Sequence, residues 1–218
     1  MPEHAVVLQR FVSQSWPGAA AFFERAEPEL ARPDGLGFRA LFASVPRRLG
    51  ALRGARPAAP LELPEARAHL LLTDFARAAL LAKAVGAAAP DRAAELHLRL
   101  FESGEMGEQV SMLRTLCLLP DPARFLDTGV AACRTNSLDV FEAIVCENPF
   151  LAQHFPALSF DQAVMKAIFM GVSVQRIEGL HARITPELSR MARSYASERR
   201  AAGRPVPDDA TYLMSYGA

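Results

Sequence analysis

Residues 148–170 read NPFLAQHFPALSFDQAVMKAIFM, and this stretch decides the fold class. Its two prolines, Pro149 and Pro156, each lie beside an apolar run and would interrupt a helix. Prolines in such positions are typical of short connections between helices. From residue 159 to residue 170 the apolar residues return with helical spacing, and Ser159 suits the entry to a helix. Helices joined by connections this short fold back on one another as antiparallel neighbours.

The same punctuation recurs along the chain, for example at Leu119-Pro120-Asp121-Pro122 and at Ile184-Thr185-Pro186. In both places a capping residue precedes a proline that fits the first helical position. Ala is abundant and β-branched residues are sparse, which also favours helix. The sequence therefore predicts an all-α fold of stacked antiparallel helical hairpins, either an α-solenoid (HEAT-like) or an irregular α-bundle.

Three parts are expected along the chain, and we predict that they form one structural domain. Residues 1–54 form an N-terminal helical part, 61–203 the main helical-hairpin region and 204–218 an extended C-terminal tail. The Arg-, Ala- and Pro-rich stretch 53–60 predicts a surface linker between the first two parts. The prolines that begin the tail cannot continue a helix, and the apolar residues beyond them predict that the tail docks on the protein.

Composition and charge exclude several classes of protein. The chain carries 24 Lys and Arg against 24 Asp and Glu, so it lacks the basic excess of a nucleic-acid binder. No basic segment followed by an apolar run opens the sequence. The longest apolar stretch, 75–89, contains Arg77 and Lys83 and is too polar to span a bilayer. We therefore expect a cytoplasmic protein without a membrane span that binds no nucleic acid.

The cysteines and histidines show no ligand spacing. The three cysteines, Cys117, Cys133 and Cys146, lie far apart in apolar contexts, which predicts free thiols in a reducing compartment. None of the five histidines has the spacing of a metal site or stands next to a plausible nucleophile. Glycine-rich phosphate-binding motifs and the common hydrolase motifs are absent as well. We therefore expect neither a metal nor a cofactor.

Several charged residues fall on apolar helix faces. Arg114 and Glu142 each lie within such a face, and so do Asp74 and Arg77 on the helix after residue 64. The face around Glu142 is formed by Leu138, Phe141 and Val145. Burying such a charge costs several kcal/mol unless it is paired, so we expect Arg114 and Glu142 to be largely buried and paired. Two interpretations stay open: Asp74 pairs with Arg77 and Arg114 with Glu142, or some of these groups line a polar pocket for a small ligand.

A second polar cluster lies at two helix junctions and contains Arg134, Asn136, Glu147 and Asn148. Residues of these types cap helix ends and form turns. The alternative is that they are displayed together at one edge of the stack as a recognition surface. Both interpretations stay open at this point.

The helix at 159–170 is apolar on two sides. Met165 and Phe169 lie nearly opposite its main apolar face, so the helix is either central or covered by a partner. Lys166 at its flank is interpreted as a snorkelling lysine, with a catalytic amine as the alternative.

From residue 113 to residue 207 the chain resembles the EboA family of bacterial proteins. The resemblance is carried by Ala132-Cys133-Arg134-Thr135-Asn136, by Cys146-Glu147-Asn148-Pro149-Phe150 and by residues 140–144, 155–156, 165–167, 176–180, 183–188 and 195–204. The N-terminal half resembles the family more loosely, through residues 42–47.

The resemblance implies a product of the ebo gene cluster, which is associated with making or exporting a secondary metabolite, and it implies no established reaction. We therefore expect a non-catalytic accessory protein that binds a metabolite or a partner from the same cluster. Two alternatives are an enzyme acting on an aromatic or prenylated intermediate, with Glu142, Glu147 and Lys166 as acid/base groups, and a pure helical scaffold. A homo-oligomer stays open. The candidate ligand- or partner-binding residues are Arg114, Arg134, Asn136, Glu142, Glu147, Asn148, Lys166 and Arg176.

Overall fold

The computed structural model describes residues 3–33, 35–57 and 68–217. The protein is 77% helical, and no strand occurs within the described residues. The all-α prediction is therefore confirmed, whereas the choice between a solenoid and a bundle stays a prediction. Residues 58–60 of the predicted linker lie outside the described residues.

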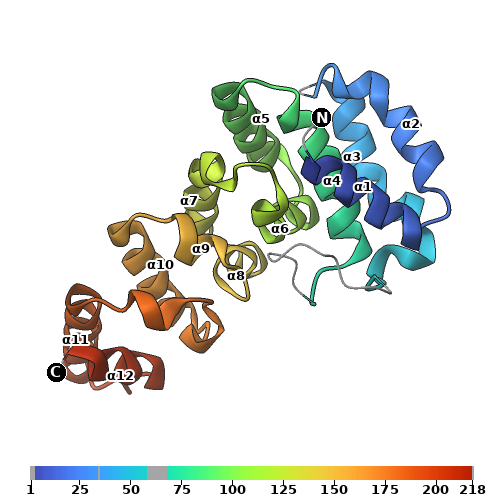
Figure 1. Cartoon of the computed structure of the whole chain (residues 1–218). Coiled ribbons are helices and arrows are strands. Elements are labelled where there is room, and N and C mark those ends of the chain that lie inside the picture. The colour runs from blue at the N-terminus through green and yellow to red at the C-terminus, as the bar shows by residue number, and fades with distance from the viewer. Residues whose placement is uncertain (1–2, 34, 58–67, 218) are drawn as a thin grey trace. The chain divides into compact units, whose positions relative to one another are not determined.

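The chain divides into two compact units, Met1–Arg134 and Thr135–Ala218. The first unit contains α1 (Glu3–Ser15), α2 (Ala19–Leu30), α3 (Leu36–Leu49), η1 (Gly50–Gly54), α4 (Leu72–Gly86), α5 (Pro90–Ser103), α6 (Met106–Arg114), η2 (Leu116–Leu118), η3 (Pro122–Phe125) and α7 (Leu126–Arg134) (Figure 1). The second unit contains α8 (Leu138–Val145), α9 (Phe150–His154), α10 (Ala157–Met170), η4 (Val174–Arg176), η5 (Leu180–Arg183), α11 (Pro186–Ala201), α12 (Asp208–Met214) and η6 (Ser215–Gly217). The η elements are short 3-10 helices. The predicted three-part division and the single domain stay predictions.

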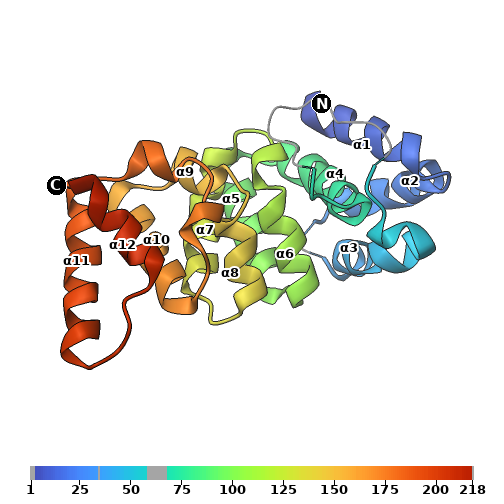
Figure 2. The same cartoon turned by 90° about the horizontal axis from the view of Figure 1, so that it is seen from below.

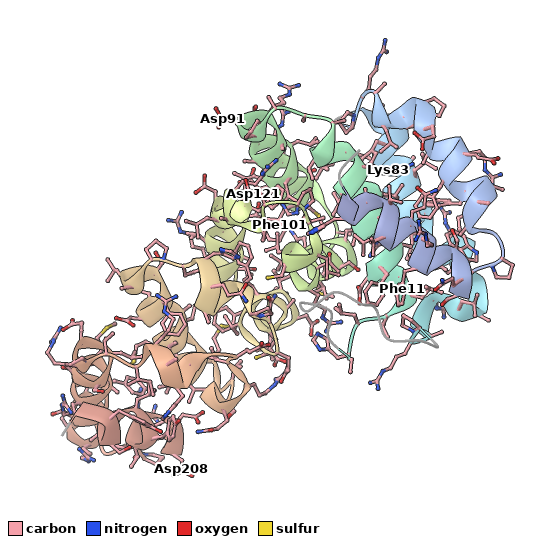
Figure 3. All side chains as sticks on the ribbon, in the orientation of Figure 1. Phe11, Lys83, Asp91, Phe101, Asp121 and Asp208 are labelled. Atoms are coloured by element: carbon pink, nitrogen blue, oxygen red, sulfur yellow. The ribbon has the colours of Figure 1, made fainter. Side chains whose placement is uncertain are left out.

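The first unit is built around α4. Every residue of this helix from Leu72 to Val85 is buried, and α1, α2, α3, α5 and α6 all contact it (Figures 1 and 2). The many alanines of α4 let these neighbours approach closely on every side. Phe11 of α1, which is labelled in Figure 3, meets Phe75 edge to face. The ring centroids are 4.9 Å apart.

Two buried charges on α4, Asp74 and Arg77, are joined by a hydroxyl from another helix. Ser111 Oγ of α6 donates to Asp74 Oδ1 (2.6 Å) and accepts from Arg77 Nη1 (3.1 Å). Asp74 Oδ2 also accepts from the backbone N–H of Leu71 (2.9 Å), which caps the start of α4. The direct Asp74–Arg77 pair, one of the two interpretations of the sequence, is thus replaced by a bridge through Ser111.

The position of Arg77 also depends on a proline in α3. Pro46 lies inside that helix and has no N–H, so the carbonyl of Phe42, four residues earlier, lacks its helical donor. Arg77 Nε donates to this carbonyl (3.4 Å), and Arg77 Nη1 donates to the carbonyl of Gly107 (2.7 Å). The guanidinium carbon lies 5.3 Å from the centroid of the Phe42 ring. Arg77 therefore ties α3, α4 and α6 together.

In the second unit, α10 contacts α11. The main apolar face of α10 is buried as the sequence predicts, and its residues are Phe160, Ala163, Val164, Ala167 and Ile168. Thr185 caps α11, because its Oγ1 accepts from the N–H of Leu188 (3.1 Å) while Pro186 occupies the first turn. The start of α11 is therefore set by local sequence.

The C-terminal tail differs from its prediction. Residues 204–207 are extended as expected, but α12 makes the following segment helical. The reason is local: the last proline is Pro207, and the two acidic residues after it suit the first turn of a helix. Ser189 Oγ of α11 donates to the carbonyl of Leu213 (2.9 Å), so the tail docks on α11.

Candidate functional site

Three of the predicted site residues, Glu142, Glu147 and Arg176, form an ion-pair cluster in the second unit. Arg176 donates from Nε and Nη2 to the two oxygens of Glu147 (2.9 and 3.0 Å) and from Nη1 to Glu142 Oε2 (2.7 Å). The hydrogen bonds to Glu147 and then to Glu142 raise the pKa of Arg176. The cluster lies at the surface, because the side chains of Glu142, Glu147 and Arg176 are 31%, 46% and 41% exposed.

The sequence predicts that Glu142 and Arg114 are largely buried, but the structure shows both residues half-buried. The buried residues of α8 are Val140, Phe141, Ala143, Ile144 and Val145. Leu138, which the sequence placed in the apolar face, is 46% exposed at the start of the helix. The true face is therefore rotated away from Leu138, and Glu142 lies at its border. The ionic partner of Glu142 is Arg176 in place of Arg114.

Glu147 and Asn148 form a strained turn between α8 and α9. The φ angle of Glu147 is 48°, a left-handed conformation that is uncommon for a residue with a side chain. Its N–H donates to the carbonyl of Arg176 (2.9 Å), so the turn and the ion pair are held together. Asn148 is 3% exposed, donates to the carbonyl of Ala143 (2.8 Å) and accepts from the N–H of Phe150 (3.0 Å). These bonds are those of a cap at a helix junction.

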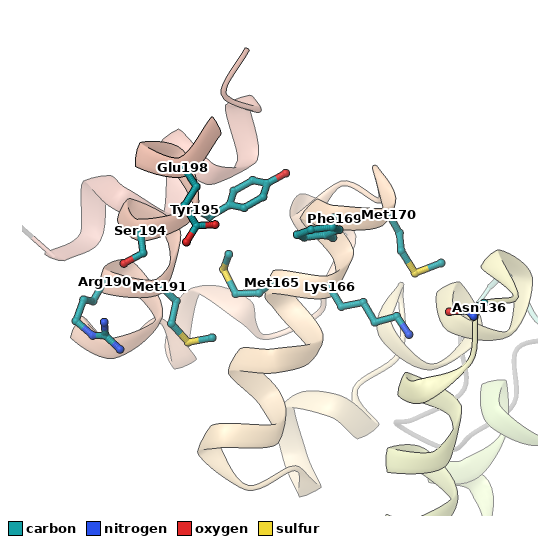
Figure 4. Close-up of a pocket in the computed structure, with 10 residues that line it drawn as sticks. All are labelled: Asn136, Met165, Lys166, Phe169, Met170, Arg190, Met191, Ser194, Tyr195 and Glu198. Carbon is teal, nitrogen blue, oxygen red and sulfur yellow. The ribbon is translucent and has the colours of Figure 1, made fainter. Parts of the chain in front are cut away.

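Two further predicted residues, Asn136 and Lys166, line an open groove of about 580 Å³ in the second unit (Figure 4). On α10, Met165 and Phe169 are one turn apart, and on α11 Met191 and Tyr195 are one turn apart. The rings of Phe169 and Tyr195 lie 5.5 Å apart between centroids. The remaining lining residues of this α10–α11 groove are Met170, Arg190, Ser194 and Glu198.

The groove has an apolar middle and a cation toward each end. Lys166 points toward Asn136 in Figure 4, and its Nζ donates to the carbonyl of Thr135 (2.6 Å). The same ammonium lies 5.2 Å from the centroid of the Phe141 ring. Its stem lines the groove while its charge meets polar neighbours, which is how a snorkelling lysine behaves. Toward the other end, Arg190 pairs with the nearby Glu187 (2.6 Å).

The last two predicted residues lie in the first unit. Arg114 is the last residue of α6, and Arg134 is the last residue of α7. The structure therefore brings Glu142, Glu147 and Arg176 together, and separately Asn136 and Lys166. That any of these residues binds a ligand or partner stays a prediction.

Sequence reasoning missed the α11 wall of the groove. The spacing of Met165 and Phe169 predicts the second apolar side of α10, but we made no matching prediction for α11. A signal did exist, because Met191 and Tyr195 are apolar residues with i, i+4 spacing in a helix that is otherwise rich in charge. Two such pairs on successive helices indicate a shared apolar strip.

The Cys146 thiol of this region is held in its neutral form. Burial raises the pKa of Cys146 to about 12, so its thiol stays protonated near neutral pH. Among the described residues, no group of three or more His, Cys, Asp or Glu side chains could hold a metal ion. Within residues 3–33, 35–57 and 68–217, no helix has both the length and the hydropathy that crossing a membrane requires.

The similarity of this chain to a known protein family covers parts of both units. A family model described as "Metabolite traffic protein EboA" matches residues 66–214, which is more than half of the chain. Searches of the curated proteins and of the solved structures find no match. The matched region contains the α10–α11 groove and the Arg176 cluster. The resemblance noted in the sequence is therefore confirmed, and the chain belongs to the EboA family.

Proposed function

We propose that the protein is a non-catalytic accessory factor that binds a small amphipathic metabolite in the α10–α11 groove. The observation that carries this proposal is the groove itself, whose volume of about 580 Å³ falls within the range of small-molecule sites. Phe169, a large ring in its wall, is 76% exposed, and such a ring gains from being covered.

The lining indicates the kind of molecule that would fit. Methionine side chains adapt to irregular apolar shapes, and the rings of Phe169 and Tyr195 offer faces and edges to an aromatic or hydrocarbon body. An acidic group on the ligand would meet Arg190 or Lys166 at the ends of the groove. The family description as a metabolite traffic protein supports the same role, because a carrier must bind its cargo without changing it.

The interpretation as an enzyme has less support. Glu142 and Glu147 both accept from Arg176, whereas Lys166 donates to the carbonyl of Thr135, so the lysine is engaged apart from the two glutamates. A partner protein of the same gene cluster, or a second copy of this chain, is the alternative occupant of the groove.

The proposal is tested by titrating the full chain with anilinonaphthalene sulfonate, an aromatic anion whose fluorescence rises when it enters an apolar site. We expect saturable binding that Phe169→Ala or Met191→Ala weakens about tenfold, because each removes apolar contact from one wall. The matched control is Leu158→Ala. Leu158 is also on α10 and is 64% exposed, but it does not line the groove.

Equal affinity in wild type, Phe169→Ala and Leu158→Ala, with unchanged circular dichroism, would show that the dye binds elsewhere and would contradict the proposal. Sedimentation of the same proteins distinguishes the occupants. A concentration-dependent dimer that Phe169→Ala abolishes would assign the groove to a second copy of the chain.

A further inference from the structure

A second hollow, of about 700 Å³, lies in the first unit between α3 and the corner where α5 meets α6. Three arginines line it: Arg77 from α4 and Arg39 and Arg47 from α3. Glu105 and Glu108, at the start of α6, line the other wall. This hollow shares no residue with the α10–α11 groove, and its polar lining suits a different kind of ligand.

Arg77 supplies the hollow with a fixed cation. The residue is only 5% exposed, and its bonds to the carbonyls of Phe42 and Gly107 and to Ser111 hold the guanidinium in one orientation. Among the described residues no carboxylate contacts it directly, because Asp74 acts through Ser111. Burial lowers the pKa of Arg77, whereas the nearby charges of Glu108 and Asp74 raise it. A buried guanidinium whose direct partners are neutral favours an additional anion.

Arg39 and Arg47 add two cations at the rim. They are eight residues apart on α3, which is slightly more than two turns, so both project from the side that faces the hollow. Both residues are exposed. Arg48, the neighbour of Arg47, is exposed as well but does not line the hollow. Three planar guanidinium groups around one space match the oxygens of a carboxylate or a phosphate.

The opposite wall, formed by Glu105 and Glu108, presents hydrogen-bond acceptors and therefore suits a ligand with donor groups. At the start of α6, Glu108 Oε2 accepts from the N–H of Glu105 (3.0 Å), and the N–H of Glu108 donates to the main-chain carbonyl of Glu105 (2.8 Å). Both carboxylates have lone pairs that can accept further hydrogen bonds. These carboxylates would repel a bare anion. Hydroxyl groups beside the anion, however, could donate hydrogen bonds to them.

We propose that this hollow binds a small hydroxylated oxyanion, meaning a carboxylic acid or a phosphate ester that also carries hydroxyl groups. The oxyanion contacts Arg77, Arg39 and Arg47, and the hydroxyl groups donate to Glu105 and Glu108. The site is independent of the proposed function of the α10–α11 groove.

The test measures the melting temperature of the full chain with millimolar glycerol phosphate, glycerate or glycerol. Both anions are expected to raise the melting temperature, glycerol is not, and the rise should shrink when salt is added. The double variant Arg39→Gln/Arg47→Gln alters only exposed residues, and we expect it to bind the anions at least about tenfold more weakly. Arg48→Gln is the matched control and should respond as the wild type does.

Comparing glycerate with glycerol phosphate identifies the preferred oxyanion. An equal response in the wild type and the double variant would overturn the proposal. An equal response to glycerol, or no response to either anion up to about 10 mM, would do so too. Phe169→Ala should bind these anions normally, so failure of the groove proposal is distinguishable from failure of this one.

Discussion

The two units each contain a cluster of charges that the sequence placed on apolar helix faces or at helix junctions, but the clusters differ in burial. In the first unit Asp74 and Arg77 are 2% and 5% exposed and share a hydroxyl. In the second unit the cluster of Arg176 with its two glutamates remains one-third to one-half exposed. A helical wheel shows which side of a helix a charge occupies. The contribution of that charge to stability depends on what covers that side of the helix.

The buried cluster should show the largest effect. We expect Asp74→Ala to lower the free energy of unfolding by ~3–5 kcal/mol, because it leaves Arg77 buried without a carboxylate behind Ser111 and removes the cap of α4. Urea unfolding of the full chain measures the loss. The control is Asp91→Ala, which alters an exposed residue in the first turn of α5 and should cost less than about 1 kcal/mol. A similarly small loss for Asp74→Ala would erase the contrast between the two clusters.

Burial in the first unit should also produce a pH dependence. His97 is fully buried with its Nδ1 3.0 Å from Thr128 Oγ1, and burial lowers its pKa to about 3. The unfolded chain has a histidine pKa of about 6.5, so between these values only the unfolded state binds the proton. Stability is therefore lost as the pH falls from about 6.5 toward about 3.

The pH effect is measured against a variant that cannot titrate. Between about pH 7 and about pH 4.5, the wild type should lose roughly 2–3 kcal/mol relative to His97→Gln. His181→Gln, which alters an exposed histidine, should keep the pH dependence of the wild type. Parallel curves for wild type and His97→Gln would mean that His97 is accessible to protons in the folded state.

The surface cluster should show the smallest effect. Glu142→Ala leaves both bonds between Arg176 and Glu147 in place, so we expect a loss below about 1 kcal/mol that shrinks further in about 1 M salt. If Glu142 were largely buried and paired with a buried arginine, as the sequence predicts, its removal would instead cost ~3–5 kcal/mol. A large, salt-independent loss in the melting curve would restore that earlier interpretation.

Local signals in the sequence predict the features that one or two residues decide. Thr185 before Pro186 predicts the start of α11, and the residues on the main face of α10 are buried as their spacing predicts. Between residues 105 and 119, by contrast, the chain is divided into α6 and η2. Thr115 stands between them, and its hydroxyl donates to the carbonyl of Ser111 (2.8 Å), which competes with regular helical bonding.

Tertiary partners could not be predicted in the same way. Nothing in the spacing of Asp74 and Arg77 reveals that Ser111, from a distant helix, lies between them. Likewise, Pro46 shows that one carbonyl of α3 lacks a donor, but only the fold shows that Arg77 supplies it. The α10–α11 groove could not be predicted for the same reason. The sequence shows the apolar strip on each helix, but it does not show that the two strips line the same groove.

The methionines of the α10–α11 groove make it sensitive to oxidants. Met165, Met170 and Met191 are half-buried, so a peroxide can reach their sulfur atoms. Conversion to the sulfoxide would turn an apolar thioether into a strongly polar group while leaving the buried face of α10 untouched. Enzymes that reduce methionine sulfoxide would reverse the change. The binding proposed for this groove would then depend on the redox state of the protein's surroundings.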